Sequence, residues 1–562
     1  GSIDLALLVV AADDGWMPQT EEHLQILTYL GVEHAVVALT KSDLATDLDS
    51  AIAMIRARLQ ESPLAHAPII PTSVTASTGI EALKGAMAQV LSQTPPPCDI
   101  GKPRLAVDRV FSLKGIGTVV TGTLTGGALR RGQGVVIEPW GLRTHIRSVQ
   151  THNREVEQGL AGSRVALNLP DLKPASGRRT RGSASVGRGD VVTIPEVGGA
   201  SSVLDVLIER TQRHQQHDEP ARPLKDGTIV RVHHGSGAFA ARVSLLEGEQ
   251  VPAGGRVIAR LVPDHPVFAF SGDRFVIRDW PEQHTLAGGV VLDADAPGGG
   301  FRKQKRRDLL TARAGNINDI NSYVASRIKH DGISSRSMLL AKSRFTRHEI
   351  DAALSQLHAT QTIVLAGDAV ADARWWQAVR VRAVQAIDEH HAKHPEHNGL
   401  PLADLRQLLD EAAIADAVIG ELCRDGFVKT AAAIRRSSHR PTLPPRLAGP
   451  GARIRGTLSA KPFDPPSRRE IAPDDTSFQA LKFLVSSGEV VEISPEVVLG
   501  SDAFNTAVQK VQDHLKQHQA ATVSELKTLL NSSRRIMVPL LEKLDRDGIT
   551  RRDGDRRMLR ST

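Results

Sequence analysis

The sequence contains only two cysteines, Cys98 and Cys423, among its 562 residues. Two thiols exclude a disulfide-rich scaffold and a cysteine-rich zinc site, and they favour a reducing compartment. No apolar run reaches the roughly 18 residues that a membrane-spanning helix needs, and the amino terminus does not have the pattern of a signal peptide. We therefore expect a cytoplasmic protein without a membrane partner.

The composition is that of a folded chain with a basic surface. Hydrophobic residues make up 41% and charged residues 24%, which is typical of globular proteins and not of disordered ones. At about 150 residues per domain, the length corresponds to roughly four domains or more. The net charge of +7 and the pI near 9.4 fit an acidic partner such as nucleic acid, although a merely soluble surface also accounts for them.

Strand and helix patterns alternate over the first hundred residues. Residues 3–12 (IDLALLVVAA) form a continuous aliphatic run, which predicts a strand covered on both faces. Alternation of this kind predicts a parallel α/β sheet with ligands at the carboxyl ends of its strands. The further strands are expected at residues 34–39 and 68–71, and the helices at residues 20–30, 51–59 and 80–91.

A β-hairpin pattern organises the next part of the chain. Residues 105–123 (LAVDRVFSLKGIGTVVTGT) contain two β-branched segments that are joined by a glycine-containing turn. Short strands continue after it at close spacing, which predicts a small barrel. Many short strands follow again between residues 189 and 296.

From residue 301 onward the pattern changes to helices with short strands. Four segments repeat a plan of two helices, a third recognition helix and a β-wing. In the last segment Phe504, Val508, Val511 and Leu515 share one helix face, and an Asp-Gly pair at residues 553–554 signals a tight hairpin. This segment holds 12 Lys and Arg against 8 Asp and Glu, with basic pairs at the third helix and the wing: Arg534, Arg535, Arg551, Arg552, Arg556 and Arg557.

These stretches resemble the translational GTPases, and within them the selenocysteine-specific elongation factors, over essentially the whole chain. The resemblance implies a multidomain fold: a partial α/β P-loop-type G domain, two β-barrels and a tandem array of winged helices. The expected boundaries are residues 1–97, 101–188 and 189–298 for the G domain and the barrels, then 301–375, 376–437, 438–500 and 501–562 for the winged helices.

The stretch TKSD at residues 40–43 resembles the guanine-specificity motif of this family. Guanine presents two N–H donor groups on one edge, and an ionised carboxylate accepts hydrogen bonds from both. The alternative is a solvated loop after a strand. The resemblance assigns the base to two loops, made of Thr40, Lys41 and Asp43 and of Ser73, Val74 and Thr75.

The phosphate half of a GTP site is missing from the sequence. The chain contains no G-x-x-x-x-G-K-[ST] motif. In the family, an Asp-x-x-Gly segment that senses the γ-phosphate comes before the strand that begins here at residue 3, and the sequence does not contain that segment there. The chain begins Gly-Ser-Ile-Asp without a methionine, and we expect it to be a fragment truncated at its amino terminus. The cofactor implied by the family is GTP with Mg²⁺, which we expect this fragment not to hydrolyse alone.

The resemblance also implies a pocket for the aminoacyl group at Asp108, Arg109 and Arg164. A free thiol titrates near pH 8.5, and a selenol is more acidic, so the selenocysteinyl side chain is an anion at neutral pH. Two guanidinium groups would hold that anion and gain little from the neutral hydroxyl of serine. Asp108 is expected to hold Arg109 in place, whereas the alternative is an ordinary surface pair of little energetic value.

The family implies a monomeric factor with three partners. It carries selenocysteinyl-tRNA, is tethered to an mRNA hairpin by the last winged helix, and acts on the ribosome at UGA codons. The six arginines of residues 501–562 are expected to grip the hairpin, although a solvated charged face also explains them. Two other functions stay open, namely another elongation factor Tu-like GTPase and a winged-helix regulator that binds duplex DNA.

Overall fold

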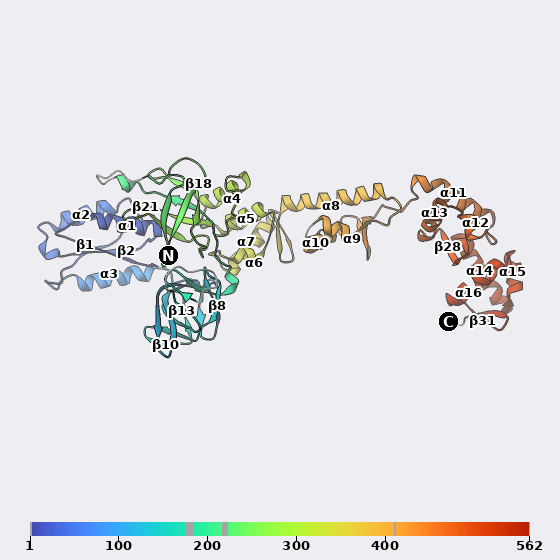
Figure 1. Cartoon of the computed structure of the whole chain (residues 1–562), viewed down its shortest axis with the longest axis horizontal. Coiled ribbons are helices and arrows are strands. Elements are labelled where there is room, and N and C mark those ends of the chain that lie inside the picture. The colour runs from blue at the N-terminus through green and yellow to red at the C-terminus, as the bar shows by residue number, and fades with distance from the viewer. Residues whose placement is uncertain (1–2, 176–184, 216–222, 410–411, 561–562) are drawn as a thin grey trace. The chain divides into compact units, whose positions relative to one another are not determined.

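The computed structural model describes residues 3–175, 185–215, 223–409 and 412–560 (Figure 1). The chain divides into two compact units, residues 1–376 and 377–562. Among the described residues, no helix combines the length and the apolar character that crossing a membrane requires.

The first domain is a three-stranded parallel sheet flanked by helices. Its strands lie in the order β1–β2–β3, with bounds Ala6–Ala11, Ala35–Thr40 and Ile69–Pro71. The helices are α1 (Pro18–Leu30), α2 (Leu48–Leu59) and α3 (Ile80–Gln93). The expectation that the first strand is covered on both faces is wrong. Leu7 and Val9 are 42% and 59% exposed, because β1 is the edge strand and no described segment packs on that face.

The second domain is an antiparallel sheet that wraps around one apolar core, which includes Leu105, Val120 and Leu167. The predicted hairpin is present as β4 (Arg104–Leu113) and β5 (Gly117–Thr125). Eight strands lie in the order β10–β9–β12–β5–β4–β15–β7–β8. The others of this sheet are β7 (Gly134–Glu138), β8 (Leu142–His145), β9 (Ser148–Thr151), β10 (Arg154–Val156), β12 (Arg164–Leu169) and β15 (Val191–Thr193).

Two short strand pairs accompany this sheet. They join β6 (Leu129–Arg130) to β11 (Gln158–Gly159) and β13 (Lys173–Pro174) to β14 (Ser185–Val186).

The third domain is a closed six-stranded barrel in the order β16–β19–β18–β17–β20–β21. Helix α1 of the first domain packs on β20 and β21. At this contact Arg213 donates two hydrogen bonds of 2.6 and 3.0 Å to the buried carboxylate of Glu21. The strands are β16 (Leu204–Glu209), β17 (Ile229–His234), β18 (Gly237–Leu245), β19 (Arg256–Pro263), β20 (Arg274–Arg278) and β21 (Thr285–Asp293).

A winged helix completes the first unit and is fused to the barrels. Lys102, just before β4, donates to Ser343 O, Ser343 Oγ and Phe345 O at 2.7–2.8 Å. Its helices are α4 (Gln304–Gly315), α5 (Ile320–Asp331), α6 (Arg336–Leu340) and α7 (Arg347–Ala359), and its strands β22 (Ile333–Ser335), β23 (Ile363–Ala366) and β24 (Ala369–Asp372).

Helix α8 (Ala373–Lys393) leads into the second unit, where the helix and wing plan recurs three times. The second winged helix continues with β25 (Leu400–Pro401), α9 (Leu402–Leu408), α10 (Ala412–Arg424), β26 (Phe427–Lys429) and β27 (Ala433–Arg436). The third consists of α11 (Pro445–Ala460), α12 (Arg468–Ile471), α13 (Asp475–Ser486), β28 (Val490–Ser494) and β29 (Val497–Gly500).

The fourth winged helix shares its core with the third. Ile493, Val497 and Leu499 of the third wing pack among the buried residues of the last domain, such as Val511 and Leu540. The two domains therefore form one packing unit. The elements of the fourth are α14 (Ser501–His518), β30 (Ala520–Thr522), α15 (Val523–Leu530), α16 (Arg534–Arg546), β31 (Thr550–Asp553) and β32 (Arg556–Leu559).

Candidate functional site

The first predicted loop lies at the carboxyl end of β2. Thr40 ends the strand, and its hydroxyl donates to Val10 O of β1. Lys41 adopts a left-handed backbone conformation with φ 55°, and its ammonium pairs with Asp13 at 2.7 Å and with Asp14 at 3.5 Å. The hydrogen bond from Lys41 holds the pKa of Asp13 below its ordinary value. Asp43, one turn further, is exposed and its carboxylate faces solvent.

The second predicted loop lies beside the first, at the carboxyl end of β3. A backbone hydrogen bond of 3.1 Å from Ser42 N to Thr72 O joins the two loops. Ser73 is buried, and its hydroxyl accepts from the backbone N–H of Ala76, whereas Val74 is 84% exposed and Thr75 is exposed as well. The structure thus brings both loops to one edge of the sheet. The inward Ser73 shapes its loop, and the outward side chains are free to contact a base.

Asp108 lies at a β-bulge between β4 and β5. The register changes between Val107, which faces Gly122, and Arg109, which faces Thr121. A side chain cannot fit at Gly122, because a Cβ there would lie 2.1 Å from Ala106 O. The bulge is therefore at a point of close backbone approach. Asp108 lies on the outer face of the sheet, because Leu105 and Val107 at the alternate positions are buried in the core.

The carboxylate of Asp108 binds Arg164 of β12. Arg164 donates two hydrogen bonds to Asp108 at 2.5 and 2.9 Å, and the hydroxyl of Thr121 adds a third at 2.9 Å. Partial burial would raise the pKa of Asp108, but these hydrogen bonds hold it below its ordinary value. The expectation that Asp108 holds Arg109 is therefore wrong, because the hydrogen-bond partners of Asp108 are Arg164 and Thr121.

Arg109 is exposed and makes no hydrogen bond or ion pair with any described residue. Its charge still contributes to lowering the pKa of Asp108. The three side chains carry one negative and two positive charges. The group therefore keeps a net positive charge, located on the guanidinium of Arg109.

A cavity of about 470 Å³ lies next to this group, between α1 and the two barrels, and Asp108 contributes to its wall. Arg109 and Arg164 are not among its lining residues. Its charged wall includes Arg104 and Asp273, which form a 2.7 Å ion pair. Burial opposes ionisation of Asp273, but Arg104 and His234 hold its pKa far below the ordinary value. The cavity wall thus includes an ion pair between Arg104 and Asp273, and Arg109 lies outside the cavity.

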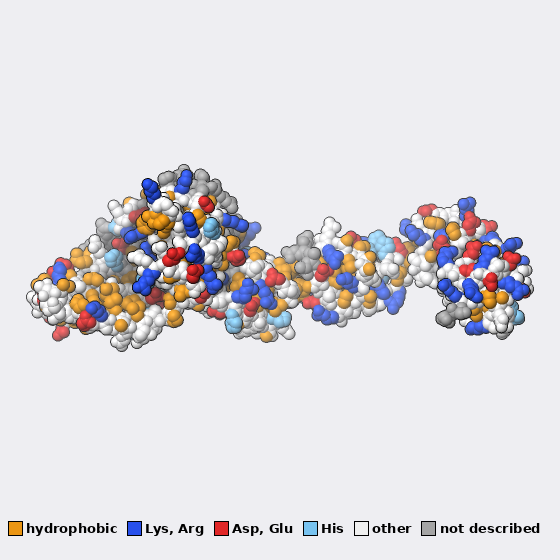
Figure 2. Space-filling model, turned by 90° about the horizontal axis from the view of Figure 1, so that it is seen from below, with side chains coloured by type: hydrophobic (Ala, Val, Ile, Leu, Met, Phe, Trp, Pro, Cys, Tyr) orange, Lys and Arg blue, Asp and Glu red, His pale blue; other side chains and the backbone are white. Residues whose placement is uncertain are grey.

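Four of the six arginines expected on the RNA-binding face are exposed without an ion pair to any described residue. Arg534 lies at the start of α16, and Arg551, Arg552 and Arg556 lie on the wing. Figure 2 shows Lys and Arg interspersed with Asp and Glu over this part of the surface. The face is thus mixed in charge, with the free cations concentrated on the wing.

The other two arginines have structural partners. Arg557 is 5% exposed, and its guanidinium donates to Asp545 at 2.9 Å. Arg535 is exposed, but it donates to Pro465 O of the third winged helix and lies 3.7 Å from Asp464. Arg557 is therefore removed from the expected binding face, because alternate residues of β32 point to opposite faces and Arg557 faces the domain core.

Comparisons with known proteins cover every part of the chain. Three family models match: the elongation factor Tu GTP binding domain over residues 1–93, the β-barrel domain of the selenocysteine-specific elongation factor over residues 211–298, and the winged helix of elongation factor SelB over residues 513–559. The selenocysteine-specific elongation factor of Desulfomicrobium baculatum is 29% identical across 99% of this chain and 88% of its own length. That of Escherichia coli (strain K12) is 26% identical across 100% of this chain and 87% of its own length.

Over essentially its whole length the chain is similar to the selenocysteine-specific elongation factors. The fold agrees with this family, because the crystal structure of the bacterial factor EF-Sec matches with a TM-score of 0.64 at 21% identity, across 100% of this chain and 87% of that one.

Sequence reasoning missed the partners of the family-assigned residues. Asp13 pairs with Lys41 because the ends of two neighbouring strands meet there, which the sequence alone does not show. Thr121 had no sequence signal, since only the register of β4 against β5 places it beside Asp108. Asp464, which accepts from Ser533, lies 69 positions away and only the packing of two domains brings it close.

Proposed function

We propose that this chain is a translation elongation factor that delivers selenocysteinyl-tRNA to the ribosome in the cytoplasm and that its last winged helix holds an mRNA hairpin. The observation that supports this function best is the combination, in one chain, of a GTP-binding domain, a selenocysteine-specific barrel and a SelB winged helix. Another elongation factor Tu-like GTPase would not require the SelB winged helix.

The two loops at the ends of β2 and β3 are proposed to recognise the base of GTP. Asp43 offers an unpaired carboxylate that can accept from two donors of guanine. Lys41 is held by Asp13, so its aliphatic stem is positioned to lie along a planar base. The described residues of this domain supply the base contacts, and the 562 residues contain no P-loop motif for the phosphates and Mg²⁺.

Arg109 is proposed to discriminate the selenocysteinyl side chain by charge. Arg164 is already neutralised by Asp108, so it positions the carboxylate and adds little attraction of its own. Arg109 is left as the cation that an ionised selenol can approach. The neutral hydroxyl of serine gains no comparable interaction.

A charge-removal variant tests this role. In the chain extended by the P-loop segment of a relative, Arg109→Ala should lower the preference for selenocysteinyl-tRNA over seryl-tRNA about tenfold. A charge-assisted hydrogen bond contributes about 1.5–3 kcal/mol, and exposure of Arg109 favours the lower end. Binding of seryl-tRNA should stay unchanged. Arg143→Ala, at an exposed arginine of the outermost strand β8, is the matched control. Equal losses for both tRNAs would mean that Arg109 grips the tRNA itself.

Competition between RNA and DNA tests the winged-helix part of the proposal. The full chain should retain a labelled mRNA hairpin from the gene of a selenoprotein when unlabelled duplex DNA of equal length is added. An RNA-binding winged helix reads A-form geometry and loop bases, whereas a DNA regulator reads the major groove. Displacement of the hairpin by equimolar duplex DNA would favour the regulator instead.

A further inference from the structure

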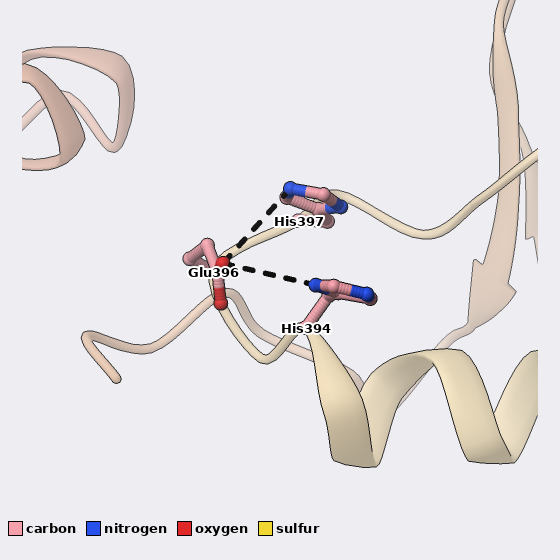
Figure 3. Close-up of side chains that lie close together, drawn as sticks. All are labelled: His394, Glu396 and His397. Carbon is pink, nitrogen blue, oxygen red and sulfur yellow. Dashed lines mark ion pairs between the residues drawn. The ribbon is translucent and has the colours of Figure 1, made fainter. Parts of the chain in front are cut away.

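A cluster of histidines lies at the end of α8 in the second winged helix, far in sequence from the residues assigned above. His390 lies on the last turn of the helix, and His394, Glu396 and His397 follow just after it. The ligand atoms of these last three side chains all lie within 4.8 Å of one another. Figure 3 shows the carboxylate of Glu396 facing both imidazoles, with one of its oxygens 4.0 Å from each of the two rings.

His390 adds a further imidazole to this group. Its Nε2 lies 3.2 Å from Nδ1 of His397, and its ring centroid is 5.0 Å from that of His394. His397 faces His390 through Nδ1 and Glu396 through Nε2, and one imidazole offers only one of its nitrogens to a given ion. The contact with His390 therefore orients the ring of His397, with His390 outside the ligand set.

One buried oxygen in the cluster lacks a hydrogen-bond partner. Oε2 of Glu396 is shielded from solvent and receives no hydrogen bond from any described residue. The nearby ammonium of Lys393 does not compensate it, because Lys393 pairs with Glu389 at 3.2 Å. The two imidazoles face the other oxygen, Oε1. A carboxylate with a buried oxygen that lacks a donor is costly, and a cation bound at Oε1 would lower that cost by pairing with the charge of the group.

The loop that carries Glu396 and His397 is fixed by the rest of its domain. The imidazole of His439 contacts the backbone carbonyl of His397 at 2.9 Å, and the backbone N–H of Thr442 donates to Pro395 O at 2.9 Å. These contacts hold the ligand atoms near one another without involving the side chains themselves. Preorganisation of this kind is what the surroundings of a metal site supply.

We propose that His394, Glu396 and His397 bind a divalent transition-metal ion, and that this ion is zinc. Two imidazole nitrogens and one carboxylate oxygen, with a water molecule in the fourth position, form a ligand set that suits zinc in four-coordinate geometry. The nitrogen ligands disfavour magnesium and calcium, which prefer oxygen. The ion would join the end of α8 to the loop before β25, and it would stabilise the second winged helix.

Zinc titration of the full chain, stripped with a chelator and followed by calorimetry, tests the proposal. We expect one zinc ion per chain, with binding at least about tenfold weaker in a His394→Ala, His397→Ala variant, since loss of ligands costs more than the 10- to 100-fold of outer contacts. Cobalt should give intense visible absorption in the wild type, as tetrahedral sites do, and magnesium should not compete.

A matched pair of histidines serves as control. His514 and His518 on α14 are two histidines with ring centroids 4.3 Å apart, and among the described residues no carboxylate joins them in a candidate metal group. Their double alanine variant should bind zinc like the wild type. Zinc should also raise the melting temperature of the wild type and of this control, but not that of the His394→Ala, His397→Ala variant. Equal zinc affinity in the wild type and the cluster variant, or loss of zinc in the control, would overturn the proposal.

Discussion

Removing the three unpaired arginines of the last wing should flatten the salt dependence of RNA binding. Arg551, Arg552 and Arg556 are exposed and lack ion-pair partners among the described residues, so each is free to contact a phosphate. Each phosphate contact contributes about 0.7–0.9 to the slope of log K against log salt. The triple alanine variant should therefore lose about 2–3 from this slope, so that raising salt from 50 to 200 mM weakens the wild type about 20- to 40-fold more than the variant.

Arg557 provides the control, since it lies on β32 beside Arg556 but its side chain is buried. Arg557→Ala should leave the salt slope unchanged, because its guanidinium faces Asp545 and not solvent. It should instead lower the stability of the domain by about 1–3 kcal/mol, as expected when a hydrogen-bonded charge loses its partner. Thr550, which also donates to Asp545 at 2.6 Å, would be the remaining donor to that carboxylate.

The assay is hairpin binding by the full chain, followed by fluorescence anisotropy at five salt concentrations, together with thermal melting of each variant. An unchanged slope in the triple variant would show that the wing does not contact phosphates. A loss of slope in Arg557→Ala without a loss of stability would refute the distinction between buried and exposed arginines.

Three further predictions follow from other parts of the chain. The 562-residue chain should bind GTP only weakly, because it contains no P-loop motif, and Mg²⁺-dependent micromolar binding in equilibrium dialysis would contradict this. Residues 438–562 should melt at a higher temperature than residues 501–562, because the shorter piece lacks Ile493, Val497 and Leu499, and equal melting temperatures would show that the shared core is dispensable. Burial and nearby Arg104 lower the pKa of Lys102 to about 8, whereas an unfolded lysine titrates near 10.4. Between about pH 8 and pH 10.4, unfolding therefore takes up a proton at Lys102. In urea titrations, the free energy of unfolding of the wild type relative to that of Lys102→Met should rise from about pH 8 to pH 10. A difference that does not change with pH would contradict this prediction.

Local patterns predicted the fold well because they depend on short-range physics. The hairpin at residues 105–123 became β4 and β5, since its β-branched segments and glycine turn specify pairing within 20 residues. The amphipathic face of α14 likewise matched the periodicity of its apolar residues. The burial of β1 on both faces was predicted wrongly. A run of aliphatic residues shows that both faces of a strand can be buried, but it does not show which segments of the chain pack against them.

The residues that contact the candidate sites from distant parts of the chain were harder to predict from the sequence than the helices and strands. Arg109 is adjacent to Asp108 in the chain, but the order of the strands, β12–β5–β4, brings Arg164 to Asp108 from 56 residues away. Arg557 is different, because its burial had a signal. In a strand with period two, Arg556 and Arg557 must face opposite sides, so only one of them belongs on the exposed face.

The four winged helices are not independent modules, and their contacts suggest why. The first is fused to the barrels by a buried network in which Arg306 of α4 binds Asp205 and Asp293 of barrel strands at 2.6–2.8 Å. Breaking such a pair leaves an uncompensated buried charge, which costs about 3–5 kcal/mol, so this domain stays with the barrels. The third and fourth share an apolar core. The second winged helix buries apolar residues of its own, such as Ile387, Leu405 and Leu422. A metal ion that joins the end of α8 to the following loop would add a cross-link within this domain, which the other three lack among their described residues.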